Sequence, residues 1–204
     1  PVFEQAFAAI LRGEVESDEF NRLVMAARMP AADIVVLRAY AKYMRQGGTP
    51  FAQDYIEGAL RINVDITRLL VQLFEARFAP GRDHLPADAE ARVARVDEIE
   101  GRLARALDDV ASLDHDRILR SYLAHITATL RTNFFQRAED GGVRPYISFK
   151  LEPSALPDLP DPKPRFEIFV YSPRVEGVHL RFGAVARGGL RWSDRRDDFR
   201  TEVL

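Results

Sequence analysis

The sequence contains no cysteine, which excludes a disulfide framework, a thiolate zinc site and a cysteine nucleophile. It also lacks an excess of either charge, because it contains 29 Lys and Arg and 31 Asp and Glu, which give a net charge of -2. Such a balance gives no overall field that would attract nucleic acid or an anionic membrane. No run is apolar over the ~20 residues that a membrane helix needs, and residues 1–4 lack the basic start of a signal peptide. We therefore expect a cytoplasmic protein that binds neither nucleic acid nor membrane.

Short motifs for nucleotide binding, metal binding and nucleophilic catalysis are missing as well. There is no G-x-G-x-x-G, no G-x-x-x-x-G-K and no G-x-S-x-G, the segments that bind phosphates or present a reactive serine. The histidines are His84, His115, His125 and His179, and none of them is four residues from another, as a metal site on one helix face requires. The sequence predicts no metal site, and no catalytic or cofactor-binding residue, within this chain.

Hydrophobic residues make up 47% of the chain, which is enough for a real core. Up to about residue 137 they recur at helical spacing, and Ser, Asp, Asn, Pro or Gly stand at the breaks as helix caps. We predict helices at about 3–11, 18–25, 30–46, 50–60, 63–79, 87–111 and 114–137. Because the links are short, neighbouring helices should be antiparallel, and 87–137 should form one long helix pair.

The hydrophobic period changes after residues 141–142. Segments 146–151, 166–171, 178–182 and 185–192 alternate or run apolar over strand lengths, and the prolines between 153 and 164 exclude a helix there. The predicted fold is mostly α, an antiparallel helical bundle with a long helix pair, followed by a partial α/β domain of about three to four strands. We divide it into a helical module, 1–137, and an incomplete domain, 138–204. Because the chain stops where a helix is beginning, we expect it to be a piece of a longer polypeptide.

The end of the last predicted strand carries the strongest candidates for chemistry. Gly188 and Gly189 remove two side chains, so that backbone can approach a ligand or another segment closely. Arg187 and Arg191 lie four residues apart on one strand face, where a guanidinium can hold a carboxylate through two hydrogen bonds. For a glycine pair alone, a tight turn or bulge without a ligand is the favoured explanation. Ion pairs with Asp194, Asp197 or Asp198 explain the arginines as well as substrate binding does. The interleaved charges of 194–202 predict a solvated helix start, with Arg200 in it.

Two longer stretches carry a family resemblance. Residues 166–182, FEIFVYSPRVEGVHLRF, and 186–204, ARGGLRWSDRRDDFRTEVL, closely resemble the large bacterial NAD-specific glutamate dehydrogenases. The resemblance is strong over about 145–204, and the helical half is similar to the helical region that precedes the catalytic domain in these very long chains.

The resemblance implies a parent enzyme that oxidises L-glutamate to 2-oxoglutarate and ammonia with NAD. In the wider family, a Lys-Gly-Gly-Ile/Leu-Arg segment lines the substrate pocket, and its lysine binds the side-chain carboxylate of the substrate. Arg187 stands at that lysine position here, so the charge is kept while the shape of the donor changes. Gly188 and Gly189 would let the strand approach the substrate, and Arg191 would brace the loop. The family's catalytic lysine and its NAD domain lie beyond Leu204, so the chain alone should be inactive.

A different class of function remains open for the helical half. Its apolar helix faces, above all those of 87–137, are typical of a module that docks protomers or regulatory segments. We therefore expect a homo-oligomer, or a regulatory interaction module without catalytic residues of its own.

Overall fold

A computed structural model describes residues 4, 7–8, 11–13, 16–81, 88–139, 141–190 and 199–204. Its helices are η1 (Glu19–Arg22), α2 (Leu23–Ala26), α3 (Ala31–Gln46), α4 (Gln53–Ile62), α5 (Val64–Phe78), α6 (Ala89–Asp108), α7 (Leu113–Ala128), η2 (Pro153–Ala155) and α8 (Phe199–Val203). Its strands are β1 (Thr129–Thr132), β2 (Ile147–Leu151), β3 (Phe166–Tyr171), β4 (Glu176–Arg181) and β5 (Ala186–Leu190). Most of the helix expected at 3–11 lies outside the described residues. Within the described ranges, no helix combines the length and apolarity needed to cross a membrane.

Cap residues set the ends of several helices. Asp88 accepts a hydrogen bond from the Ala91 amide at the start of α6, and the Ser112 hydroxyl accepts one at the start of α7. Gly48 has a φ of 82°, a conformation that glycine adopts without strain, directly after α3. The predicted start of α4 was too early, because the helix begins at Gln53 rather than beside Pro50.

All five strands form one antiparallel sheet in the order β1-β2-β3-β4-β5. The expected fold class, helices followed by a sheet, is confirmed, although the sheet has one strand more than predicted. The extra strand, β1, occupies residues that we expected to continue the helix to 137. Leu130 of β1, which continues the apolar spacing of the predicted helix, is 42% exposed. The change of structure at Thr129 has a tertiary cause, since this residue pairs with Leu151 of β2.

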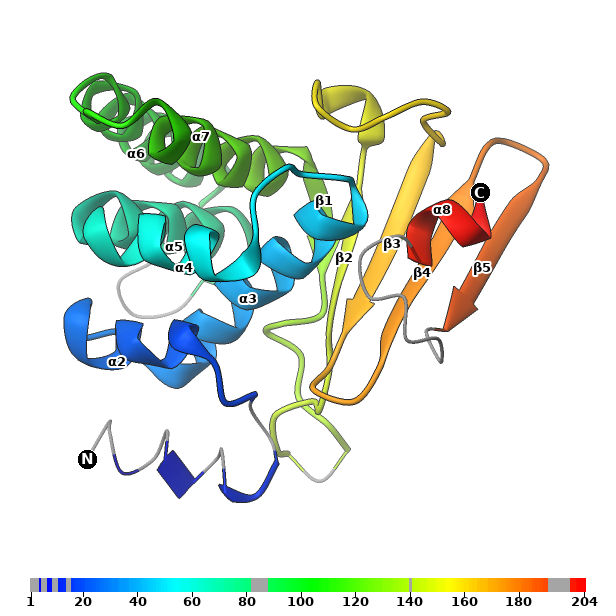
Figure 1. Ribbon diagram of the computed structural model, residues 1–204, viewed down its shortest axis with the longest axis horizontal. Helices are drawn as coiled ribbons and strands as arrows, with labels where there is room; N and C mark the ends of the chain where they lie inside the picture. The colour runs from blue at the N-terminus through cyan, green and yellow to red at the C-terminus, as the bar shows by residue number, and fades with distance from the viewer. Residues whose placement is uncertain are drawn as a thin grey trace.

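Helix α3 lies between the other helices and the sheet (Figure 1), and it is buried on nearly all sides. The ring of Tyr40 stacks on Phe149 of β2 with centroids 4.1 Å apart, and Tyr43 packs on Phe169 of β3 at 5.3 Å. The long helix α6 packs mainly along α5. The helical part and the sheet therefore share one core, and the division at residue 137 stays a prediction.

Candidate functional site

The predicted site residues lie on β5, the edge strand next to β4. Its register places Arg187 opposite Leu180, Gly188 opposite His179 and Gly189 opposite Val178. Leu180 and Val178 are buried and His179 is exposed, so Arg187 and Gly189 belong to the covered face of the sheet and Gly188 to the other.

Arg187 is nevertheless exposed, because β5 lies at the rim of that covered face. Its Nη1 donates a hydrogen bond to the backbone carbonyl of Leu204, directly after α8. Arg191 lies outside the described residues, as do Asp194, Asp197 and Asp198, the proposed ion-pair partners. The structure thus places Arg187 beside α8.

Each glycine of the pair has a packing reason in addition to any role in binding. A Cβ at Gly189 would lie 3.3 Å from Cγ2 of Val203 and 3.5 Å from Cζ of Phe199, both on α8. A Cβ at Gly188 would lie 3.1 Å from the carbonyl oxygen of Val178 on β4. Because Cβ contacts of 3.1 and 3.3 Å are shorter than most real ones, the glycines let β4 and Val203 of α8 approach the backbone of β5. They lie within a strand, so the expected alternative of a tight turn is wrong.

Helix α8 lies over β4 and β5 (Figure 1) and is held by a buried polar cluster. Arg200 is 1% exposed, and its Nε donates to both carboxylate oxygens of Glu167 on β3, at 2.9 and 3.0 Å. The backbone N–H of Arg200 donates to Oε1 of Gln46 on α3 at 3.0 Å, and Gln46 Nε2 donates to Glu176 of β4 at 3.1 Å. The expectation of a solvated Arg200 is therefore wrong.

The electrostatics of this cluster follow from its burial. Removal from water raises the pKa of Glu167, and the positive charge of Arg200 opposes that rise. Burial, reinforced by the Glu167 charge, raises the pKa of the neighbouring Tyr43 hydroxyl well above its ordinary value. Removing either the buried carboxylate or the buried guanidinium should be strongly destabilising, because it leaves the other charge buried without a partner.

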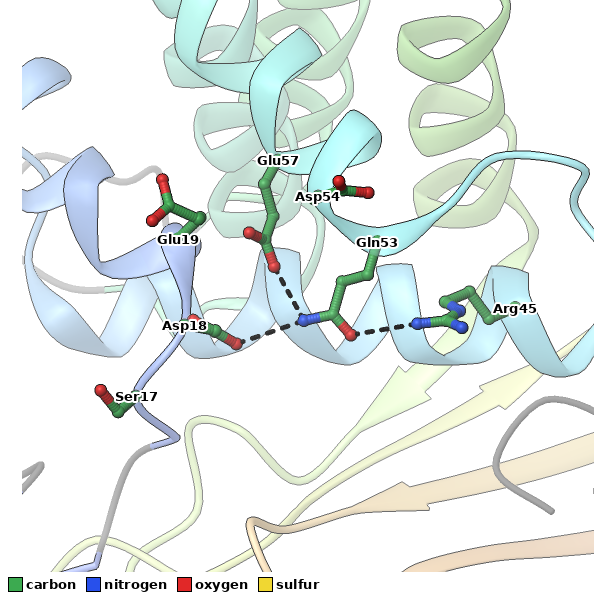
Figure 2. Close-up of a pocket in the computed structure, with 7 residues that line it drawn as sticks. All are labelled: Ser17, Asp18, Glu19, Arg45, Gln53, Asp54 and Glu57. Atoms are coloured by element: carbon green, nitrogen blue, oxygen red, sulfur yellow. Dashed lines mark hydrogen bonds between the residues drawn. The ribbon is translucent and has the colours of Figure 1, made fainter. Parts of the chain in front are cut away.

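A second polar site, which the sequence did not indicate, lies between η1 and α4. It is an open pocket of about 480 Å³ lined by Ser17, Asp18, Glu19, Arg45, Gln53, Asp54 and Glu57 (Figure 2). The Gln53 amide nitrogen donates to Glu57 at 2.7 Å and approaches Asp18 at 3.5 Å. Asp18 stands at the N-cap position of η1 but makes no side-chain cap hydrogen bond. Its carboxylate binds the buried Arg38 through both oxygens, at 2.6 and 2.7 Å.

Burial raises the pKa of Glu57 to about 7, although its hydrogen bond from Gln53 works in the opposite direction. The four-residue spacing of Gln53 and Glu57 could have indicated that they share a helix face. The spacing does not indicate that η1 packs beside them.

A smaller cavity, of about 250 Å³, lies between α7 and the 156–159 loop, and its wall includes His125. Burial lowers the pKa of this histidine to about 4, and its Nδ1 donates to the carbonyl of Ser121 at 2.7 Å. In the part of the chain that the structure describes, no three His, Asp or Glu residues are grouped as metal ligands.

Comparisons with known proteins point to one family. The catalytic domain of bacterial NAD-glutamate dehydrogenase matches residues 102–204, and helical motif 3 of glutamate dehydrogenase matches residues 15–80. The chain is 52% identical to the NAD-specific glutamate dehydrogenase of Pseudomonas aeruginosa over 203 residues, 100% of the chain. It is 50% and 51% identical, over 99% of its length, to those of Halomonas elongata and Mycobacterium tuberculosis. It spans only 12% of the length of each of these relatives.

Proposed function

The chain belongs to the bacterial NAD-glutamate dehydrogenase family, and we propose that it forms part of an enzyme that oxidises L-glutamate to 2-oxoglutarate and ammonia with NAD. Identity of about half of all residues to three proteins of that name supports the activity and the cofactor. In such an enzyme NAD accepts a hydride from the substrate. The share of this chain would be to bind and orient glutamate.

Within that reaction, we propose that β5 forms one wall of the glutamate pocket. The observation that carries this is the position of Arg187, a guanidinium at the exposed rim of an otherwise covered sheet face. A guanidinium presents parallel N–H donors that match the two oxygens of a carboxylate. Arg187, Gly188 and Gly189 are the proposed substrate-binding residues, and Arg191 is proposed to brace the same wall.

The test is substitution of Arg187 in the full-length enzyme. Arg187→Ala should lower kcat/KM for L-glutamate by about 30-fold or more, equivalent to about 2 kcal/mol, if the guanidinium binds a desolvated carboxylate. Arg187→Lys should keep part of this activity, because the charge remains. The matched control is Arg181→Ala on β4, an exposed arginine on the opposite face of the sheet. Equal kinetics for Arg187→Ala and Arg181→Ala would assign Arg187 to structure alone.

The 204-residue chain itself should not oxidise glutamate in the presence of NAD. Hydride transfer requires the cofactor to be held against the substrate, and the sequence of this chain has no dinucleotide-binding motif. Turnover by the purified chain would contradict the assignment of catalysis to other parts of the enzyme.

We also propose a cytoplasmic homo-oligomer. The absence of cysteine fits a reducing compartment. Large apolar side chains on the helices support contact between copies, since Ile62 is 64% exposed, Val93 59% and Leu113 73%. Sedimentation velocity of the full-length enzyme tests the assembly, and a monomer at micromolar concentration would overturn it.

A further inference from the structure

Three elements from distant parts of the sequence meet at α8. Gln46 comes from the end of α3, Glu167 from β3 and Arg200 from α8 itself. Gln46 is 3% exposed, Glu167 0% and Arg200 1%, and the hydrogen bonds among them are 2.9 to 3.0 Å long. We call these three residues the α8 anchor. Its members are polar and fully buried, so their partners fix where α8 can lie.

The α8 anchor is linked to Arg187 by the register of the sheet. One row of paired residues runs from Glu167 to Leu180 and on to Arg187, so that all three side chains lie on the same face. With strands ~4.8 Å apart, Arg187 is about 10 Å from Glu167. The next row on that face, two residues along each strand, brings Gly189 under Phe199 and Val203 of α8.

Both ends of helix α8 contact β5. Phe199 and Val203 lie within 3.3 to 3.5 Å of the position that a Cβ on Gly189 would take, and the Leu204 carbonyl accepts from Arg187. A rotation or shift of α8 would therefore change both the support of the strand and the surroundings of the Arg187 guanidinium.

Resting on the proposed function, we propose that Gln46, Glu167 and Arg200 are positioning residues for glutamate binding. They hold α8, and α8 holds β5 and the Arg187 guanidinium in the geometry that receives the substrate carboxylate. Gln46 makes the helical half part of this arrangement, because α3 supplies the acceptor for the backbone N–H of Arg200 in α8. All three are buried, so their effect on binding would be exerted through α8.

The experiment compares two isosteric changes that each remove the carboxylate of a buried arginine pair. Glu167→Gln breaks the pair in the α8 anchor, and Asp18→Asn breaks the pair with Arg38, whose side chain is 0% exposed, far from β5 in the helical part. A third variant, Gln46→Leu, leaves the arginine pair intact. It removes the acceptor for the Arg200 amide and the donor to Glu176, and it keeps a similar volume. Full-length enzyme is assayed for KM of L-glutamate, KM of NAD, kcat and melting temperature.

We expect both arginine-pair variants to melt at lower temperature. Only Glu167→Gln and Gln46→Leu should raise KM for L-glutamate, by about fivefold or more, because small displacements of a binding group are costly. KM for NAD should stay unchanged in all three. An unchanged glutamate KM in Gln46→Leu and in any folded Glu167→Gln enzyme would overturn the proposal. So would an equal rise in Asp18→Asn, since the effect would then follow stability alone.

Arg187→Ala in the same assay separates this inference from the proposed function. If Arg187→Ala leaves glutamate kinetics unchanged, the assignment of the β5 wall fails. If Arg187→Ala raises KM while the anchor variants do not, the wall stands and only the positioning role is refuted.

Discussion

Glu57 should make the free energy of unfolding of this protein fall as the pH rises. Its side chain is 5% exposed and faces Asp18 and Glu19 across the pocket of Figure 2. Burial, supported by the repulsion of Asp18, raises its pKa from 4.5 to about 7. The folded protein therefore binds a proton that the unfolded chain releases, so the stabilisation is complete below pH 4.5 and is lost as the pH rises through 7.

The size of the effect follows from the shift. At about 1.4 kcal/mol per pKa unit, the contribution of Glu57 should decrease by between about 2 and 3 kcal/mol from pH 5 to pH 8. Glu57→Gln removes the titration and keeps the oxygen that accepts from Gln53. The variant should exceed the free energy of unfolding of the wild type by about 1 kcal/mol or less at pH 5, and by about 3 kcal/mol at pH 8.

Urea denaturation of the 204-residue chain at pH 5, 6, 7 and 8 measures this directly. Asp54→Asn is the matched control, because Asp54 lines the same pocket and is exposed. Its stability should run parallel to that of the wild type at every pH. Parallel curves for Glu57→Gln and the wild type would show that Glu57 is solvated, and the burial argument would then be wrong.

Two further substitutions, with Gly58→Ala as a control for the second, test the opposite pH response and the packing. Burial lowers the pKa of His125 from 6.5 to about 4, so its contribution to the free energy of unfolding is present above pH 6.5 and is lost as the pH falls toward 4. In urea denaturation, the free energy of unfolding of His125→Asn should therefore fall by about 2 kcal/mol less than that of the wild type between pH 7 and pH 5. Gly189→Val should destabilise by about 1 to 3 kcal/mol in thermal unfolding, because its side chain meets Phe199 and Val203. Gly58→Ala in α4, where no atom lies within 4 Å, should not destabilise.

Local patterns predicted most of the helices and strands. Segments 30–46 and 166–171 match α3 and β3 to within one residue, because proline or glycine stands at or near their ends. The prediction of a helix that continues to 137 was wrong, for a reason that lies outside that segment of the sequence. Leu130 keeps helical spacing, yet pairing with β2 offers the backbone other partners from Thr129 onward. Tertiary contacts of this kind override local preference.

The candidate site was predicted in its residues but not in its surroundings. Arg187 was identified through a sequence resemblance, and the structure adds its place at a sheet rim beside α8. Arg200 was predicted to be solvated because acidic residues precede and follow it at close spacing. Its actual partner, Glu167, lies 33 residues earlier on another element. No periodicity connects the two, since their contact exists only once the sheet has formed.

The position of α3 has an evolutionary consequence. The helical motif recognised over 15–80 contains α3, while the catalytic domain recognised over 102–204 contains the strands on which α3 packs. Tyr40 and Phe149 meet across that boundary, so a change of shape on one side must be matched on the other. We expect these two segments to be inherited together. A chimaera that takes 15–80 from one relative and 102–204 from another should fold poorly, whereas moving both segments together from one parent should be tolerated.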